Sequence, residues 1–395
     1  MRGKAIVAGV LAVLICMLKY PHRLFRGFLW AEDGPIFILQ AAQHGFRAIW
    51  IPYNGYLHAI PRLIAGSWTA LSTPDHFIHG FAWTCTAAYF IIAYSLFCLS
   101  RRHFPSNWRG HLLSLSVAVL PFAVPQSGEI YFTITNLQWF FSPLLAFLVI
   151  DFGVGIDSPI RRWSAMVLAL TGPFGVLLLP LAGVLWLSHR SRRLRPLLPY
   201  LMGCAMQLVS YTLTHGQETS SRISNYALTK DFPTSAIGEV FVPNSVDFFY
   251  QHQGVCLLAT CGLLALALLN GIRATKLSLP LFIAAAVLWT IGVIRQGTPD
   301  MLIHWYGYGA RYLFMPELCF GVGLLFAAVS GVLTIGRLAA ITLLCTMVWK
   351  APLPIVPHAD DTAVTKESGM FMLRFPPARE LQLNTSEGNS AFSLK

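Results

Sequence analysis

The stretch 4–35, KAIVAGVLAVLICMLKYPHRLFRGFLWAEDGP, joins an apolar segment to two adjacent carboxylates, Glu32 and Asp33. Acids are scarce in this chain, with 17 Asp and Glu among 395 residues. Hydrophobic residues make up 55% of the chain and charged residues 11%, whereas soluble domains carry charge on about a quarter of their residues. We therefore expect lipid to be the main solvent, and the acid pair at the membrane surface is a functional-site hypothesis.

The apolar segments predict the fold class. A helix needs about 20 mostly apolar residues to cross a bilayer, and nine segments approach this description. They are 3–20, 77–99, 112–124, 137–150, 196–213, 254–270, 279–294, 313–329 and 332–349. The sequence predicts an all-α polytopic membrane protein, with a bundle of about 9–11 transmembrane helices.

The segment 163–187 is harder to assign, because basic residues flank both of its ends. A single crossing would place one basic cluster outside, against the tendency of Lys and Arg to stay in the cytoplasm. Thr171-Gly172-Pro173 interrupts the segment near its middle. We expect a broken hairpin with both ends in the cytoplasm, buried against protein that satisfies its free backbone groups. A kinked single span is the alternative.

The charge distribution then sets the topology. We expect a cytoplasmic N-terminus, with the basic loops inside and every acid except Asp151 and Asp157 outside or at the outer rim. The domains are a transmembrane part, 1–350, and a small extracytoplasmic tail, 351–395. The outer loops are about 20–75, 125–136, 214–253 and 295–312. A bacterial inner membrane suits this arrangement. The net charge of +11 fits anionic lipid neighbours better than nucleic acid, because no basic run is interleaved with aromatic residues.

The first outer loop has internal organisation. The segment 35–50 has the pattern of an amphipathic helix that lies in the membrane interface. Residues 52–56, PYNGY, predict a turn, and 57–71 predicts a return toward the membrane. In the polar tail, the short run 370–375 resembles a strand.

An acid pair at an outer surface favours transfer of a sugar from an activated donor. The attacking hydroxyl needs a base to accept its proton, and a phosphate leaving group departs as a stable anion without a general acid. Arginine is the best partner for the charge that develops on that phosphate. The outer segments contain Arg62, Arg222 and Arg311 as candidates for this role. Candidates for substrate contact are Tyr53, Tyr56, His58, His304 and Tyr306.

The chain resembles the GT-C glycosyltransferases, multi-span enzymes that use polyprenyl-phosphate sugars and carry an acidic motif in the first extracytoplasmic loop. Glu32-Asp33 lies where that motif lies, and 55–63 and 309–312 are similar to patterns in bacterial members that decorate surface polysaccharide. The resemblance implies that Asp33 is the general base, with Glu32 or Glu129 as its partner. It also implies that Arg62 or Arg311 holds the donor phosphate, and that the acceptor is a lipid-linked or surface glycan.

Each candidate also has a plain structural interpretation. Asp33 precedes Gly34-Pro35 and suits a helix N-cap. Glu129 is suited to capping a turn, and Arg62 to extending its side chain to lipid phosphate. His76 and His79 have HxxH spacing without an evident third ligand, so no metal site is expected. No cofactor motif is present, and dependence on a divalent metal is left open.

Two other functions remain open. The break at Gly172-Pro173 is typical of transporters, whose interrupted helices build sites in the membrane, so a transporter or flippase of a polar lipid or lipid-linked saccharide is the main alternative. Against it, no acid lies deep within a candidate span. A ligase or polymerase of lipid-linked glycans would share the chemistry proposed for the transferase.

Overall fold

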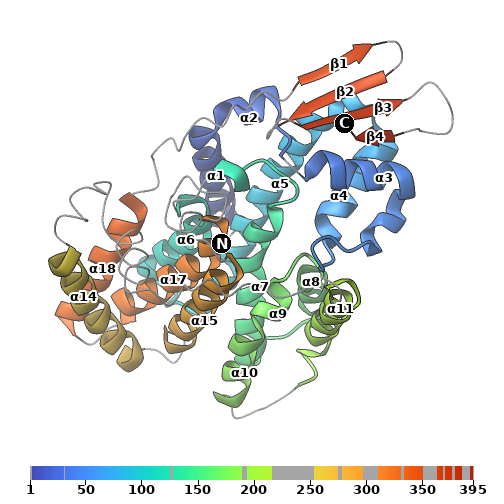
Figure 1. Ribbon diagram of the computed structural model, residues 1–395. Coiled ribbons are helices and arrows are strands. Elements are labelled where there is room, and N and C mark those ends of the chain that lie inside the picture. Colours follow the sequence, from blue (N-terminus) through green and yellow to red (C-terminus); the bar gives the residue numbers. More distant parts are fainter. Residues whose placement is uncertain are drawn as a thin grey trace.

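The computed structural model in Figure 1 is built mainly of helices. It describes residues 2–30, 32–124, 128–188, 194–215, 253–274, 278–296, 310–330, 333–349, 363–367, 370–375, 379–384 and 392–394. Every statement below concerns these residues.

All nine segments predicted as spans form helices. They are α1 (Arg2–Lys19), α5 (Pro74–Ser100), α6 (Trp108–Ala123), α7 (Leu137–Gly153), α11 (Leu198–His215), α14 (Gln253–Ala274), α15 (Ser278–Gln296), α17 (Phe314–Ser330) and α18 (Thr334–Trp349). The starts follow local chemistry: Pro74 occupies the first turn of α5, and the Asn107 side chain accepts a hydrogen bond from the Gly110 N–H at the start of α6.

Two helices of the described residues are long and apolar enough to cross a membrane. One is α5, and the other is the helical run Arg311–Val329. The crossing predicted for the other helices stays a prediction.

The first loop is helical but divided. After α2 (Pro21–Arg26), the segment predicted as one amphipathic helix forms a π-helix η1 (Asp33–Ile38), α3 (Leu39–His44) and a 3-10 helix η2 (Gly45–Trp50). Gly45 separates the last two with φ of 57°, a left-handed value that interrupts a helix. The following segment forms the helix α4 (Ala59–Leu71), and its return toward the membrane stays a prediction.

The segment predicted as a broken hairpin has that form. It comprises α8 (Pro159–Ala169), α9 (Phe174–Leu177) and α10 (Leu179–Ser188). At one end of α7, a Cβ on Gly153 would lie 2.8 Å from the Cβ of Leu185 in α10. At the opposite end of α7, the rings of Trp139 and Phe174 are 4.8 Å apart. The chain therefore leaves the Gly153 end in α8, breaks near Trp139 and returns in α10.

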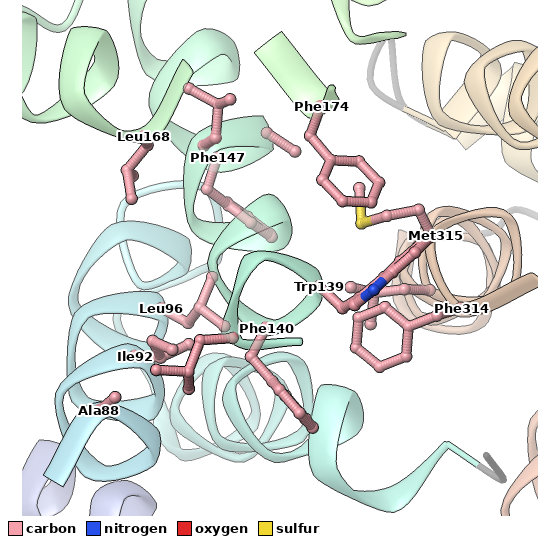
Figure 2. Close-up of a cluster of buried hydrophobic side chains, with 14 of the residues drawn as sticks. Ala88, Ile92, Leu96, Trp139, Phe140, Phe147, Leu168, Phe174, Phe314 and Met315 are labelled. Atoms are coloured by element: carbon pink, nitrogen blue, oxygen red, sulfur yellow. The ribbon is translucent and has the colours of Figure 1, made fainter. Parts of the chain in front are cut away.

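The helices share one main core of buried apolar side chains, to which α1, α5 to α11, and the adjoining faces of α15 and α17 contribute. Figure 2 shows part of it, where Trp139 and Phe140 of α7 meet Phe314 and Met315 of α17. A second cluster joins α14, α15, α17 and α18, which lie together on one side of the molecule in Figure 1.

The C-terminal tail departs from the all-α prediction. It forms a four-stranded antiparallel sheet in the order β1-β2-β3-β4, made of β1 (Ala363–Glu367), β2 (Met370–Phe375), β3 (Arg379–Asn384) and β4 (Phe392–Leu394). The predicted strand 370–375 is confirmed as β2, which pairs Met370 with Asn384 of β3. The polar composition of the tail gave no sign of the other strands.

Candidate active site

The first loop approaches the site through the predicted turn. Tyr53 and Tyr56 exchange two backbone hydrogen bonds, with N to O distances of 2.9 and 3.0 Å. Between them, Asn54 and Gly55 have φ of 50° and 83°, the left-handed values that favour Asn-Gly in tight hairpins. The turn brings the Tyr53 and His58 rings to a centroid distance of 5.8 Å.

These side chains line a cavity of about 140 Å³ between the first loop, the start of α7, α9, α15 and the 3-10 helix η5 (Ala310–Leu313). Five residues predicted for the site are in its wall: Glu32, Tyr53, Tyr56, His58 and Arg311. The polar part of the wall that the sequence analysis missed comprises Asn54, Thr135, Asn136, Gln138 and Trp139. The amides of Asn136 and Gln138 at the edge of the apolar segment 137–150 were the available signal.

The two carboxylate oxygens of Glu32 differ in their hydrogen bonding. The Tyr53 hydroxyl donates to Oε1 at 3.2 Å, while Oε2 is buried and has no hydrogen-bond partner among the described residues. Burial and the nearby Glu32 charge together raise the pKa of Tyr53 to about 12, so Tyr53 stays a hydrogen-bond donor. Glu32 is thus a carboxylate in a cavity wall with one oxygen that makes no hydrogen bond within the described part of the chain.

Asp33 lies behind the wall and is fully buried. Its Oδ1 accepts hydrogen bonds from the Thr135 N–H at 3.0 Å and the Thr135 hydroxyl at 2.5 Å, and its Oδ2 accepts one from the Trp30 N–H at 3.0 Å. Burial raises the pKa of Asp33 to about 7, against the lowering effect of these hydrogen bonds. Asp33 is the first residue of η1, whose N-cap position is Glu32, and its carboxylate accepts from the preceding Trp30, so the N-cap interpretation is wrong.

Arg62 is buried, with a side chain only 1% exposed. None of its three guanidinium nitrogens has a hydrogen-bond partner within the described part of the chain, and the group lies 5.2 Å from the Phe37 ring centroid. The interpretation of Arg62 as a side chain extended to lipid phosphate is therefore wrong. Burial and then the Arg62 charge lower the pKa of His58 to about 4, so His58 is neutral near pH 7.

Glu129 and Arg311 were predicted for separate roles, and the structure pairs them. Glu129 lies in the 3-10 turn η3 (Gly128–Ile130) and is buried, and its Oε2 accepts a hydrogen bond from Arg311 Nη1 at 3.1 Å. Arg311 lines the cavity, whereas Glu129 lies outside its wall. Arg311 therefore reaches the site with its charge partly compensated.

A buried glutamine that the sequence analysis missed holds the first loop against the break in 163–187. Gln207 of α11 accepts a hydrogen bond from the Leu57 N–H at 2.8 Å, and its Nε2 donates to the carbonyls of Leu57, Ala169 and Gly172 at 2.9, 3.2 and 3.0 Å. The Gly172 N–H donates to the Leu57 carbonyl at 2.8 Å. These bonds satisfy the backbone freed by the break, as buried polar groups require.

Three predicted site residues, Arg222, His304 and Tyr306, lie outside the described residues. Within the described part, no group of three or more His, Cys, Asp or Glu side chains is arranged to hold a metal ion. His76 and His79 therefore have no third ligand among these residues.

The chain matches no model of a known protein family, no curated protein and no solved structure.

Proposed function

We propose that this chain is an integral membrane glycosyltransferase of the GT-C kind. It would transfer a sugar from a polyprenyl-phosphate donor to a lipid-linked or cell-surface glycan outside the cytoplasm, with inversion at the anomeric carbon. The observation that carries this proposal is the carboxylate of Glu32, with one oxygen that has no partner among the described residues, in the wall of a cavity that the first loop shares with aromatic side chains.

In this mechanism Glu32 is the general base. Its Oε2 accepts the proton of the acceptor hydroxyl, whose oxygen attacks the anomeric carbon while the bond to the phosphate oxygen breaks. Glu32 supports this role better than Asp33, because Asp33 is outside the cavity wall and already accepts three hydrogen bonds. Asp33 instead supports the wall by fixing Thr135.

The leaving phosphate needs positive charge at the cavity. Arg311 lines the wall. Arg62 lies outside the wall, but its guanidinium has no hydrogen-bond partner among the described residues and its charge acts on His58, which lines the wall. A charge-assisted bidentate contact from arginine to phosphate would both hold the donor and stabilise the developing anion. Because His58 is neutral, the arginines supply the positive charge that the leaving phosphate needs.

A cytoplasmic N-terminus and an extracytoplasmic cavity complete the proposal. At the end of α7 away from the cavity, Asp151 accepts hydrogen bonds from Arg102 at 3.0 Å and His103 at 2.8 Å, and lies 3.5 Å from Arg161. This excess of basic residues at the far end is typical of a cytoplasmic face.

Sugar transfer in membranes containing the wild type, Glu32→Gln or Asp33→Asn tests the proposal, with radiolabelled polyprenyl-phosphate sugars as donors. We expect Glu32→Gln to lower transfer by at least about a hundredfold, the range of general base catalysis, and Asp33→Asn to lower it less at equal folded protein. Full transfer by Glu32→Gln would refute the assignment of the base.

A flippase or transporter of a lipid-linked saccharide is the second candidate. The broken segment supports it, because Pro173 and Phe174 at the break line the cavity and interrupted helices form transport sites. Movement of labelled lipid across liposomes without a covalent product would favour this function over transfer.

A further inference from the structure

The cavity wall contains several polar atoms that the fold leaves without partners. Within the described residues, Glu32 Oε2, His58 Nδ1, Gln138 Oε1 and Trp139 Nε1 are buried and make no hydrogen bond, and all four side chains line the cavity. A buried polar atom without a partner destabilises the folded chain. Four such atoms in residues of one wall point to a ligand whose polar groups supply the missing hydrogen bonds.

Gln138 and Trp139 are neighbours in the first turn of α7, and their side chains are only 8% and 6% exposed. The Trp139 ring packs edge-on against Phe174 at 4.8 Å and Tyr312 at 5.5 Å. In Figure 2 the Trp139 side chain lies between Phe174 and Phe314. Packing on both sides fixes the direction of the indole N–H.

The start of α7 is held in place as well. The Asn136 side chain donates to the Glu129 carbonyl at 2.7 Å, which anchors the residue before the helix. Across the break, a Cβ on Gly172 would lie 1.8 Å from Gln138 Oε1, so only glycine permits the carboxamide to occupy its position. Both side chains, which line the cavity, are therefore held by a rigid frame.

Trp139 Nε1 and Gln138 Oε1 require different hydrogen-bond partners. An indole N–H only donates and a carboxamide oxygen only accepts. A phosphate dianion offers acceptors alone and an ammonium group offers donors alone, whereas a hydroxyl both donates and accepts. Adjacent hydroxyl groups on a sugar ring would satisfy Trp139 Nε1 and Gln138 Oε1 together and leave Glu32 Oε2 for the acceptor hydroxyl.

We propose that Gln138 and Trp139 bind hydroxyl groups of the transferred sugar and determine which sugar the site accepts. This inference rests on the proposed function and assigns the recognition of the sugar to α7, apart from the arginines assigned to the phosphate. A site built to bind a hydroxyl rejects an analogue that lacks it, because its buried polar groups stay unpaired.

The test compares binding of sugar-bearing and sugar-free carriers to the purified full chain in detergent. The probes are short-chain polyprenyl phosphates that carry glucose, galactose, mannose or arabinose, together with the bare polyprenyl phosphate. The variants are Trp139→Phe, which keeps the ring packing and removes the N–H, and Gln138→Met, which keeps the length and removes the amide. The matched controls are the exposed Trp163→Phe and Gln43→Met.

We expect the wild type to bind one sugar-bearing probe more tightly than the bare carrier. Each α7 variant should reduce that preference about tenfold, leave the affinity for the bare carrier unchanged, and melt near the wild-type temperature. The controls should keep the preference. A deoxy analogue of the preferred sugar should bind the wild type more weakly, with little further loss in the variant that lacks the matching group.

The inference is overturned if the wild type has no preference for any sugar-bearing probe. It is also overturned if both α7 variants keep the preference, or if they weaken the binding of the bare carrier and of the sugar-bearing probe equally. A wild type that shows the preference and loses it in the variants, yet transfers no sugar, would support this inference while refuting the proposed transferase.

Discussion

At the scale of single residues, Glu32 and Asp33 are adjacent in sequence but have different environments. Glu32 lines the cavity and has one carboxylate oxygen without a hydrogen-bond partner among the described residues, whereas Asp33 is buried behind Thr135 and accepts three hydrogen bonds. The sequence showed that the pair matters and could not show which acid faces the cavity. That depends on Thr135, more than a hundred residues away along the chain.

Asp33 predicts a pH-dependent stability. Burial raises its pKa to about 7 in the folded chain, against about 4 when unfolded. Between these values the native state keeps a proton that the unfolded chain has released. The stabilisation is therefore fully present below about pH 4 and is lost as pH rises to about 7. We expect the melting temperature of the wild type to decrease from about pH 5 to pH 8 relative to Asp33→Asn, followed by differential scanning fluorimetry in detergent.

The exposed Asp75→Asn is the matched control, and it should parallel the wild type across this range. Asp33→Asn should also melt lower than the wild type at about pH 5, because an amide cannot accept from all three donors and one of them loses its partner. A constant difference between wild type and Asp33→Asn at every pH would contradict the raised pKa.

Arg62 predicts a conflict between stability and function. Its buried guanidinium has no hydrogen-bond partner among the described residues, so the charge costs free energy in the folded state. We expect Arg62→Met to stabilise the chain by about 1–3 kcal/mol and to lower sugar transfer. Pyrophosphate should raise the melting temperature of the wild type more than that of the variant. The exposed Arg47→Met should change neither property, and a destabilised Arg62→Met would contradict the assignment.

At the scale of elements, the apolar pattern predicted helices well because each pattern is local. The nine predicted spans coincide with helices from α1 to α18, and the turn 53–56 follows from Asn54-Gly55. The division of 33–50 into three short helices was missed, because an amphipathic pattern continues through Gly45. The contacts of Gln207 were also missed, because they join α11 to residues of two distant segments.

Gln207 predicts a strong coupling between the first loop and the break after α8. Its fully buried carboxamide makes four hydrogen bonds to backbone groups of Leu57, Ala169 and Gly172. We expect Gln207→Leu to destabilise the chain by about 2–4 kcal/mol, because several buried backbone groups lose their partner. Hydrogen exchange should increase at 55–59 and 169–173.

The exposed Gln43→Leu serves as the control and should leave exchange at both segments unchanged. If Gln207→Leu raised exchange uniformly over α11 while the two segments stayed protected, the coupling through this side chain would be refuted.

At the scale of the whole molecule, the sided distribution of charge predicts the topology, and the segment 159–188 is its sharpest test. A hairpin places Arg195, which follows α10, on the same side as the loop between α5 and α6. A single crossing places it on the opposite side. The packing of Leu185 near Gly153 favours the hairpin.

Single cysteines at exposed positions distinguish these topologies in intact cells: Arg195→Cys as the test, Ser106→Cys in the α5–α6 loop, and His76→Cys at the start of α5. A membrane-impermeant maleimide should label His76→Cys in intact cells, and should label Arg195→Cys and Ser106→Cys only after the membrane is opened. The parent chain measures the background, which should be low because native cysteines lie in apolar helices. Labelling of Arg195→Cys together with His76→Cys in intact cells would contradict the hairpin. It would also move a basic cluster to the outer face, against the charge rule on which the proposed location of the cavity depends.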